Sequence, residues 1–75
     1  MFGSEKITKT MEIEGMSCMH CAKKVEDSLK ALKGVKNVTV NLEEKKATVV
    51  MKQEIANETL KNVVEELGYE VKGIV

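Results

Sequence analysis

Residues 8–34 read TKTMEIEGMSCMHCAKKVEDSLKALKG, and the spacing of their apolar side chains changes along the stretch. Met11 and Ile13 alternate with polar neighbours, which predicts a half-buried strand at 8–14. After a break at 15–18, apolar residues recur on one helical face, which predicts a helix at 19–33; they are Ala22, Val25, Leu29 and Leu32. Gly34 follows where a capping glycine often ends a helix. A strand, a short turn and a helix therefore open the domain, with Cys18 in the turn and Cys21 in the first turn of the helix.

The rest of the chain adds a hairpin, a second helix and a last strand. Alternating apolar residues predict strands at 35–42 and 46–52, joined by a polar turn and close enough to pair antiparallel. A second helix is expected at 57–67, with Asn57 as its N-cap and Gly68 as its stop. Tyr69, Val71 and Ile74 indicate a last strand. The order β-α-β-β-α-β predicts an α+β fold: a ferredoxin-like sandwich with two helices on one face of a four-stranded antiparallel sheet.

Length and charge exclude several classes of function. A chain of 75 residues forms one domain with a small core, which favours a binding module over an enzyme. Its 12 basic and 12 acidic side chains cancel, so we expect no nucleic-acid partner. We also expect no membrane segment, because no apolar run approaches the length of a span, and a cytoplasmic location by default. Residues 1–6 are expected to be a flexible lead-in, and residues 7–75 the domain.

Cys18 and Cys21 lie on either side of the predicted start of the first helix. Helix N-termini favour negative charge, which favours the thiolate form of a cysteine. Thiolates are soft donors that suit Cu(I), whereas structural zinc takes four ligands and only His20 adds a borderline donor nearby. A C-x-x-C pair also occurs in thiol-disulfide oxidoreductases, but those usually carry it on a thioredoxin-like pattern with a facing proline. This chain has no proline, so the residues favour a metal site.

The seven residues Gly15-Met16-Ser17-Cys18-Met19-His20-Cys21 resemble the G-M-[ST]-C-x-x-C loop of heavy-metal-associated domains. Such domains occur as free copper chaperones and as N-terminal domains of metal-pumping P-type ATPases. The resemblance spans about residues 8–73, with further matches at Gly34-Val35, Val38, Asn41-Leu42 and Gly68-Tyr69. It implies a carrier, not an enzyme, with Cys18 and Cys21 as the metal ligands. The expected cargo is Cu(I), with Ag(I), Hg(II), Cd(II) and Zn(II) as alternatives.

Four neighbours of the cysteines have both a structural and a functional interpretation. The resemblance implies that Met16 packs beneath the loop, and methionine fills irregular gaps well. Met19 is expected to be exposed. For both methionines the alternative is direct ligation of the metal by the thioether. His20 is expected to face solvent, with tuning of the thiols, or ligation where two chains meet, as the alternative. Tyr69 is expected to be half-buried with its hydroxyl reaching water, unless it shields or tunes the site.

The first predicted helix carries a cluster of basic residues: Lys23, Lys24, Lys30 and Lys33. They form either a solvated face or a docking surface for an acidic partner. The resemblance implies that this partner is the metal-binding domain of a copper-transporting P-type ATPase or a copper-responsive regulator. The chain itself is either a free chaperone or such an ATPase domain. We expect a monomer without metal and a metal-bridged dimer with Cu(I).

Overall fold

The computed structural model describes residues 7–75, and the expected lead-in at 1–6 lies outside the described residues. Six elements follow one another in the predicted order. They are β1 (Ile7–Glu14), α1 (Met19–Lys30), β2 (Val35–Asn41), β3 (Lys46–Met51), α2 (Asn57–Glu66) and β4 (Glu70–Ile74). The ferredoxin-like element order is therefore confirmed.

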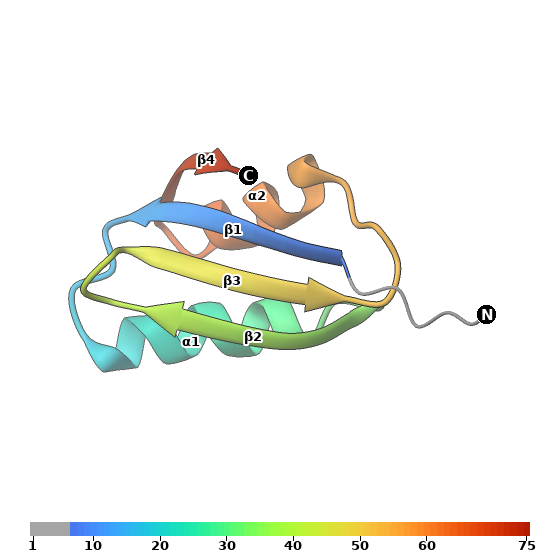
Figure 1. Ribbon diagram of the computed structural model, residues 1–75. Coiled ribbons are helices and arrows are strands. Elements are labelled where there is room, and N and C mark those ends of the chain that lie inside the picture. Colours follow the sequence, from blue (N-terminus) through green and yellow to red (C-terminus); the bar gives the residue numbers. More distant parts are fainter. Residues whose placement is uncertain (1–6) are drawn as a thin grey trace.

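The four strands form one antiparallel sheet in the order β2-β3-β1-β4 (Figure 1). The predicted hairpin is present, with Thr39 opposite Thr48 and Asn41 opposite Lys46. β1 lies between β3 and β4, and Glu14 at its end is opposite Glu70. This last pairing brings the residues after β1 next to those before β4.

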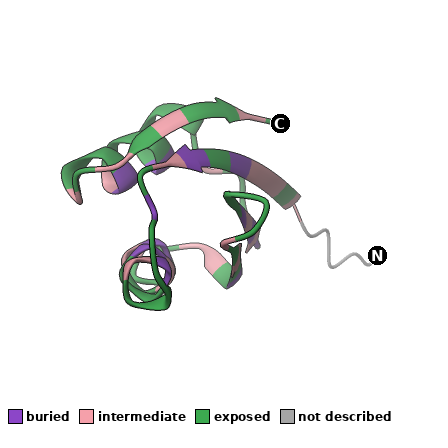
Figure 2. Cartoon of the chain, turned by 90° about the vertical axis from the view of Figure 1, so that its left-hand side faces the viewer, coloured by how far each residue is buried: buried purple, intermediate pink, exposed green. Residues whose placement is uncertain are grey.

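The core lies between one face of the sheet and the two helices. Alternation in β1 and β3 turns Met11, Ile13 and Met51 toward the helices, and all three are fully buried. Leu29 of α1 and Leu60 of α2 meet them in the same cluster. The buried positions seen in Figure 2 are therefore the apolar half of each alternating or helical pattern.

α1 is shorter than its apolar pattern predicts: it ends at Lys30 and not at residue 33. The Ala31 N–H still donates to Asp27, but the Leu32 N–H donates to Leu29, three residues back. This tightening ends the helix. Leu32 packs against the core from the turn instead, which is why the apolar spacing continues past the helix.

Asn57 is not the N-cap of α2, so that prediction is wrong. The cap is Ala56, whose carbonyl accepts from the N–H groups of Thr59 and Leu60. The Asn57 side chain instead accepts a 2.6 Å hydrogen bond from the Lys9 ammonium. Lys9, on β1, also donates to the Ile55 carbonyl at 2.9 Å. A long-range contact to a charged donor therefore takes the place of local capping. At the other end, Gly68 follows α2 as expected, with φ +98°.

Candidate metal site

The loop that carries the cysteines runs from residue 15 to residue 18, between the end of β1 and the start of α1. It lies at the end of the molecule that also carries the β2–β3 turn (Figure 1). Gly15 opens the loop with φ +104°, a conformation that glycine adopts without steric cost. The chain thereby leaves the sheet and turns directly into the helix.

Both thiols are free and lie close together. Cys18 is the N-cap residue of α1, in extended backbone, and its side chain makes no capping hydrogen bond. Cys21 lies in the first turn of the helix, as predicted. The two Sγ atoms are 3.7 Å apart. Cys18 is exposed, whereas Cys21 is half-buried and packs against the core. The pair is therefore open to solvent on the Cys18 side.

The surroundings of Cys21 favour its thiolate. Its pKa falls from 9.0 to about 7, chiefly because the Tyr69 hydroxyl hydrogen-bonds to the sulfur, then because of the Ser17 backbone N–H and the Cys18 thiol. Desolvation opposes this shift. The same contact raises the pKa of Tyr69. From the sequence, the helix N-terminus predicts a thiolate, whereas the largest cause of the lowered pKa in the structure is Tyr69.

The other neighbours lie where the sequence places them. Met16 belongs to the core cluster and is only 8% exposed, which confirms its packing role. Met19 is 74% exposed, and His20 is exposed. Tyr69 is half-buried, as expected, but its hydroxyl lies beside Cys21. Figure 2 looks onto this end of the molecule and shows a largely exposed loop.

The contact between Gly15 and Tyr69 is not predicted by the sequence pattern. A Cβ placed on Gly15 would lie 3.2 Å from Cδ1 of the tyrosine ring. Gly15 belongs to the cysteine-loop motif, but the motif does not say which residue lies where its Cβ would be. The pairing of Glu14 with Glu70 brings Tyr69 to that position. No local pattern in the sequence carries that signal.

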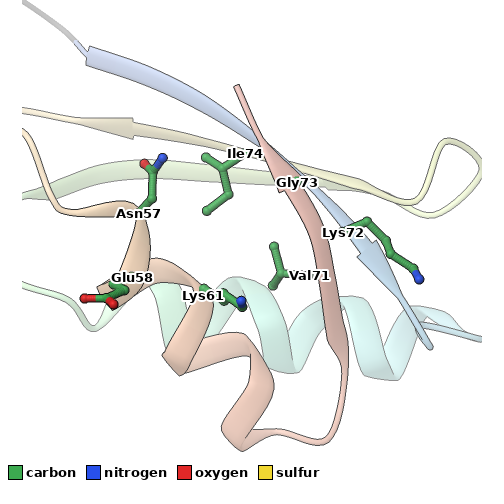
Figure 3. A pocket seen from close by; sticks show the side chains of 7 residues that line it. All are labelled: Asn57, Glu58, Lys61, Val71, Lys72, Gly73 and Ile74. Atoms are coloured by element: carbon green, nitrogen blue, oxygen red, sulfur yellow. The ribbon is translucent and has the colours of Figure 1, made fainter.

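Within residues 7–75 the structure groups no three side chains of His, Cys, Asp or Glu that could hold a metal ion together. The two sulfurs are therefore not completed by a third such donor from the described chain. A hollow of about 240 Å³ lies elsewhere, between α2 and β4 (Figure 3). Its lining contains no cysteine; it consists of Asn57, Glu58, Lys61, Val71, Lys72, Gly73 and Ile74. No helix of residues 7–75 has the length and apolar character needed to cross a membrane.

The basic residues of α1 differ in their ion pairs. Lys30 lies 3.5 Å from Glu26, and Lys23 lies 4.0 Å from Asp27, at the limit of an ion pair. Lys24 forms no ion pair among the described residues. Exposed pairs of this kind contribute little stability. The lysines nearest the cysteines are thus largely free to meet another charge.

The fold and the cysteine loop define the class of protein: the chain belongs to the heavy-metal-associated domain family, whose pattern matches residues 10–70. It is 42% identical over 65 residues to the copper chaperone CopZ of Staphylococcus epidermidis, covering 85% of this chain and 96% of that one. It is 41% identical over 66 residues to copper-transporting ATPase 2 of Rhizobium meliloti, covering 87% of this chain and 8% of the ATPase. A solved CopZ metallochaperone superimposes with a TM-score of 0.82 at 35% identity, covering 87% of this chain and 98% of that one.

Proposed function

We propose that this chain is a Cu(I) metallochaperone that binds one ion between the sulfurs of Cys18 and Cys21. The observation that carries the proposal is the pair of free thiols 3.7 Å apart on an exposed loop. Thiolates suit a soft ion, and Cu(I) accepts two ligands. The similarity to CopZ along nearly its whole length supports copper over the other soft ions.

Transfer would proceed by exchange of sulfur ligands, with no change in the oxidation state of copper. A partner thiolate binds Cu(I) to give a three-coordinate intermediate, and one original cysteine thiolate then leaves. Cys18 is exposed and Cys21 half-buried, so the partner's first sulfur approaches from the Cys18 side. Carrying, and not catalysis, is the role this geometry supports, in a reducing cytoplasm that keeps both thiols free.

A Cu(I) titration tests the ligands. Reduced protein is titrated without oxygen against a Cu(I) chelator, together with Cys18→Ser, Cys21→Ser and Met16→Leu. We expect one Cu(I) per chain, loss of tight binding in each cysteine variant, and retained binding in Met16→Leu. That last change nearly conserves volume and should cost less than about 1.5 kcal/mol of stability. An end point far from one, Zn(II) outcompeting Cu(I), or a Met16→Leu variant as defective as the cysteine variants would contradict the assignment.

The proposed receiver is a cysteine-pair domain of a copper-transporting ATPase with acidic residues around its loop; a copper-responsive regulator is the alternative receiver. Lys23 and Lys24 are exposed and lie within one helical turn of Cys21, so they must lie close to any partner that reaches the sulfurs. Salt screens such charges over about 8 Å at physiological ionic strength. Stopped-flow transfer should therefore slow as salt rises, and slow further in Lys23→Glu with Lys24→Glu. Lys36→Glu with Lys52→Glu changes the charge by the same amount beside the start of β2, and should leave the transfer rate unchanged. A transfer rate that changes neither with salt nor with the double substitution would refute the docking surface.

The exposed site also predicts how the protein associates. Without metal we expect a monomer, and with Cu(I) a dimer in which the ion bridges sulfurs of two chains, with the exposed His20 nearby. Sedimentation with and without Cu(I) measures this. A stable dimer of metal-free protein would contradict it.

The second candidate is a metal-binding domain of a copper-transporting P-type ATPase. The similarity to the Rhizobium meliloti ATPase favours it. The ligands and the exchange steps are the same for both candidates. They differ in whether the chain acts alone, which the size of the native protein in its own cells decides.

A further inference from the structure

Gly15 lies directly against Tyr69. A Cβ on Gly15 would lie 3.2 Å from the ring atom Cδ1 and 3.8 Å from the Tyr69 Cα. The first distance is shorter than ordinary van der Waals contact, so the ring rests against the glycine because no side chain separates them. The backbone φ of +104° is a second, independent requirement for glycine.

Two other glycines show that these requirements are separable. Gly68 has φ +98°, but a Cβ there would meet nothing within 4 Å. Gly34 has φ +99°, and its Cβ would meet Gln53, an exposed side chain at the other end of the molecule. Among these three glycines, Gly15 alone has an aromatic ring close to the position that a Cβ would take, and this ring lies at the cysteine loop.

The tyrosine held in this way is a neighbour of the half-buried Cys21. Tyr69 and Cys21 are both partly buried and pack against the same core cluster. The pairing of Glu14 with Glu70 fixes the two segments side by side. We infer that Gly15 is a positioning residue for the metal site: its missing Cβ lets the Tyr69 ring lie against the loop, and the ring limits access to Cys21. The inference rests on the proposed function in taking Cys21 as a ligand, whereas the contact itself needs no metal.

The test measures access to Cys21 in reduced, metal-free protein. Alkylation by iodoacetamide is followed at each cysteine by tandem mass spectrometry over a pH series. The limiting rate at high pH is compared, because both thiols are then fully ionised. We expect Gly15→Ala to raise the limiting rate at Cys21 several-fold, and Gly34→Ala, the control for backbone strain, to leave it unchanged. Tyr69→Ala should raise it by the same factor, and the double variant no further. Tyr69→Phe keeps the ring, so its limiting rate should rise only by the gain in thiolate nucleophilicity that a higher Cys21 pKa brings, and should stay well below that of Tyr69→Ala.

Several results would overturn the inference. The first is a limiting alkylation rate at Cys21 that is the same in Gly15→Ala as in the wild type. The second is an equal increase of this rate in Gly15→Ala and Gly34→Ala. The third is a double variant, Gly15→Ala with Tyr69→Ala, whose rate increase is the product of the two single increases. If Gly15→Ala does not fold, equal limiting rates in Tyr69→Ala and Tyr69→Phe refute the covering role. Tyr69 is the only tyrosine and there is no tryptophan, so acrylamide quenching of its fluorescence gives a second readout. Quenching should increase in Gly15→Ala and not in Gly34→Ala. Neither readout involves copper, so a failed Cu(I) titration would leave this result standing.

Discussion

Replacing Tyr69 by Phe removes one hydroxyl from the site and leaves the ring in place. That hydroxyl is the largest cause of the fall in the pKa of Cys21 from 9.0 to about 7. We expect the pKa to rise toward 9.0 in the variant without reaching it, because the Ser17 N–H and the Cys18 thiol still hydrogen-bond to the sulfur. At pH 7 the thiolate fraction is about one half for a pKa of about 7, and about 1% for a pKa of 9.0. The thiolate fraction of Cys21 in Tyr69→Phe must fall between these two values.

The assay is a pH titration of the cysteine Cβ resonances in reduced, metal-free protein labelled with ¹³C at that atom. Ser17→Ala is the matched control, because the Ser17 side chain is the smallest of the causes and its backbone N–H remains. A Tyr69→Phe midpoint equal to that of the wild type would refute the role of the hydroxyl. So would a Ser17→Ala shift as large as that of Tyr69→Phe.

The same shift makes stability depend on pH. Folding lowers the pKa of Cys21, so its contribution is present above pH 9.0 and is lost as the pH falls through about 7. The wild-type protein should therefore gain stability relative to Tyr69→Phe as the pH rises from 7 to 9. Urea unfolding of both proteins across this range measures the difference, and a constant difference would contradict the linkage.

Three further predictions concern the scaffold, each checked by urea unfolding. Lys9→Met removes the ammonium that holds Ile55 and Asn57, and should cost about 2 kcal/mol while leaving Cu(I) binding intact; a change below about 0.5 kcal/mol would make that contact dispensable. Leu60→Ala opens a cavity in a fully buried position and should cost about 2–5 kcal/mol, and an exposed-site value near zero would place Leu60 outside the core. Lys45 has φ +58°, so Lys45→Gly should stabilise the protein by up to about 1 kcal/mol, and destabilisation would contradict this backbone conformation.

The sequence predicts the fold well because its signals are local and periodic. The alternation around Met11 and the helical spacing around Leu29 each identify the buried face of their element. The order of the elements then predicts the ferredoxin-like fold. The predictions that fail depend on contacts between distant residues. Asn57 has the chemistry of an N-cap, but Lys9 of another element binds it instead. Leu32 continues a helical spacing from a turn, because the core and not the helix needs its side chain.

The candidate site likewise has features that local sequence predicts and features that depend on distant residues. The positions of Cys18 and Cys21 follow from the start of α1, which the sequence pattern locates. The half-burial of Cys21 and its contact with Tyr69 depend on how β4 pairs with β1. Pairing of this kind joins residues far apart in the chain, and a single sequence carries no direct record of it.

The most direct test of the central proposal is the number of sulfur atoms bound to copper. X-ray absorption at the copper edge measures it in protein loaded with one Cu(I) per chain, at a dilution where sedimentation shows a monomer. We predict two sulfur ligands in the wild-type protein and in Met16→Leu, and loss of that signal in Cys18→Ser and Cys21→Ser. A third ligand in the monomer, or two sulfurs that persist when either cysteine is replaced, would contradict the account.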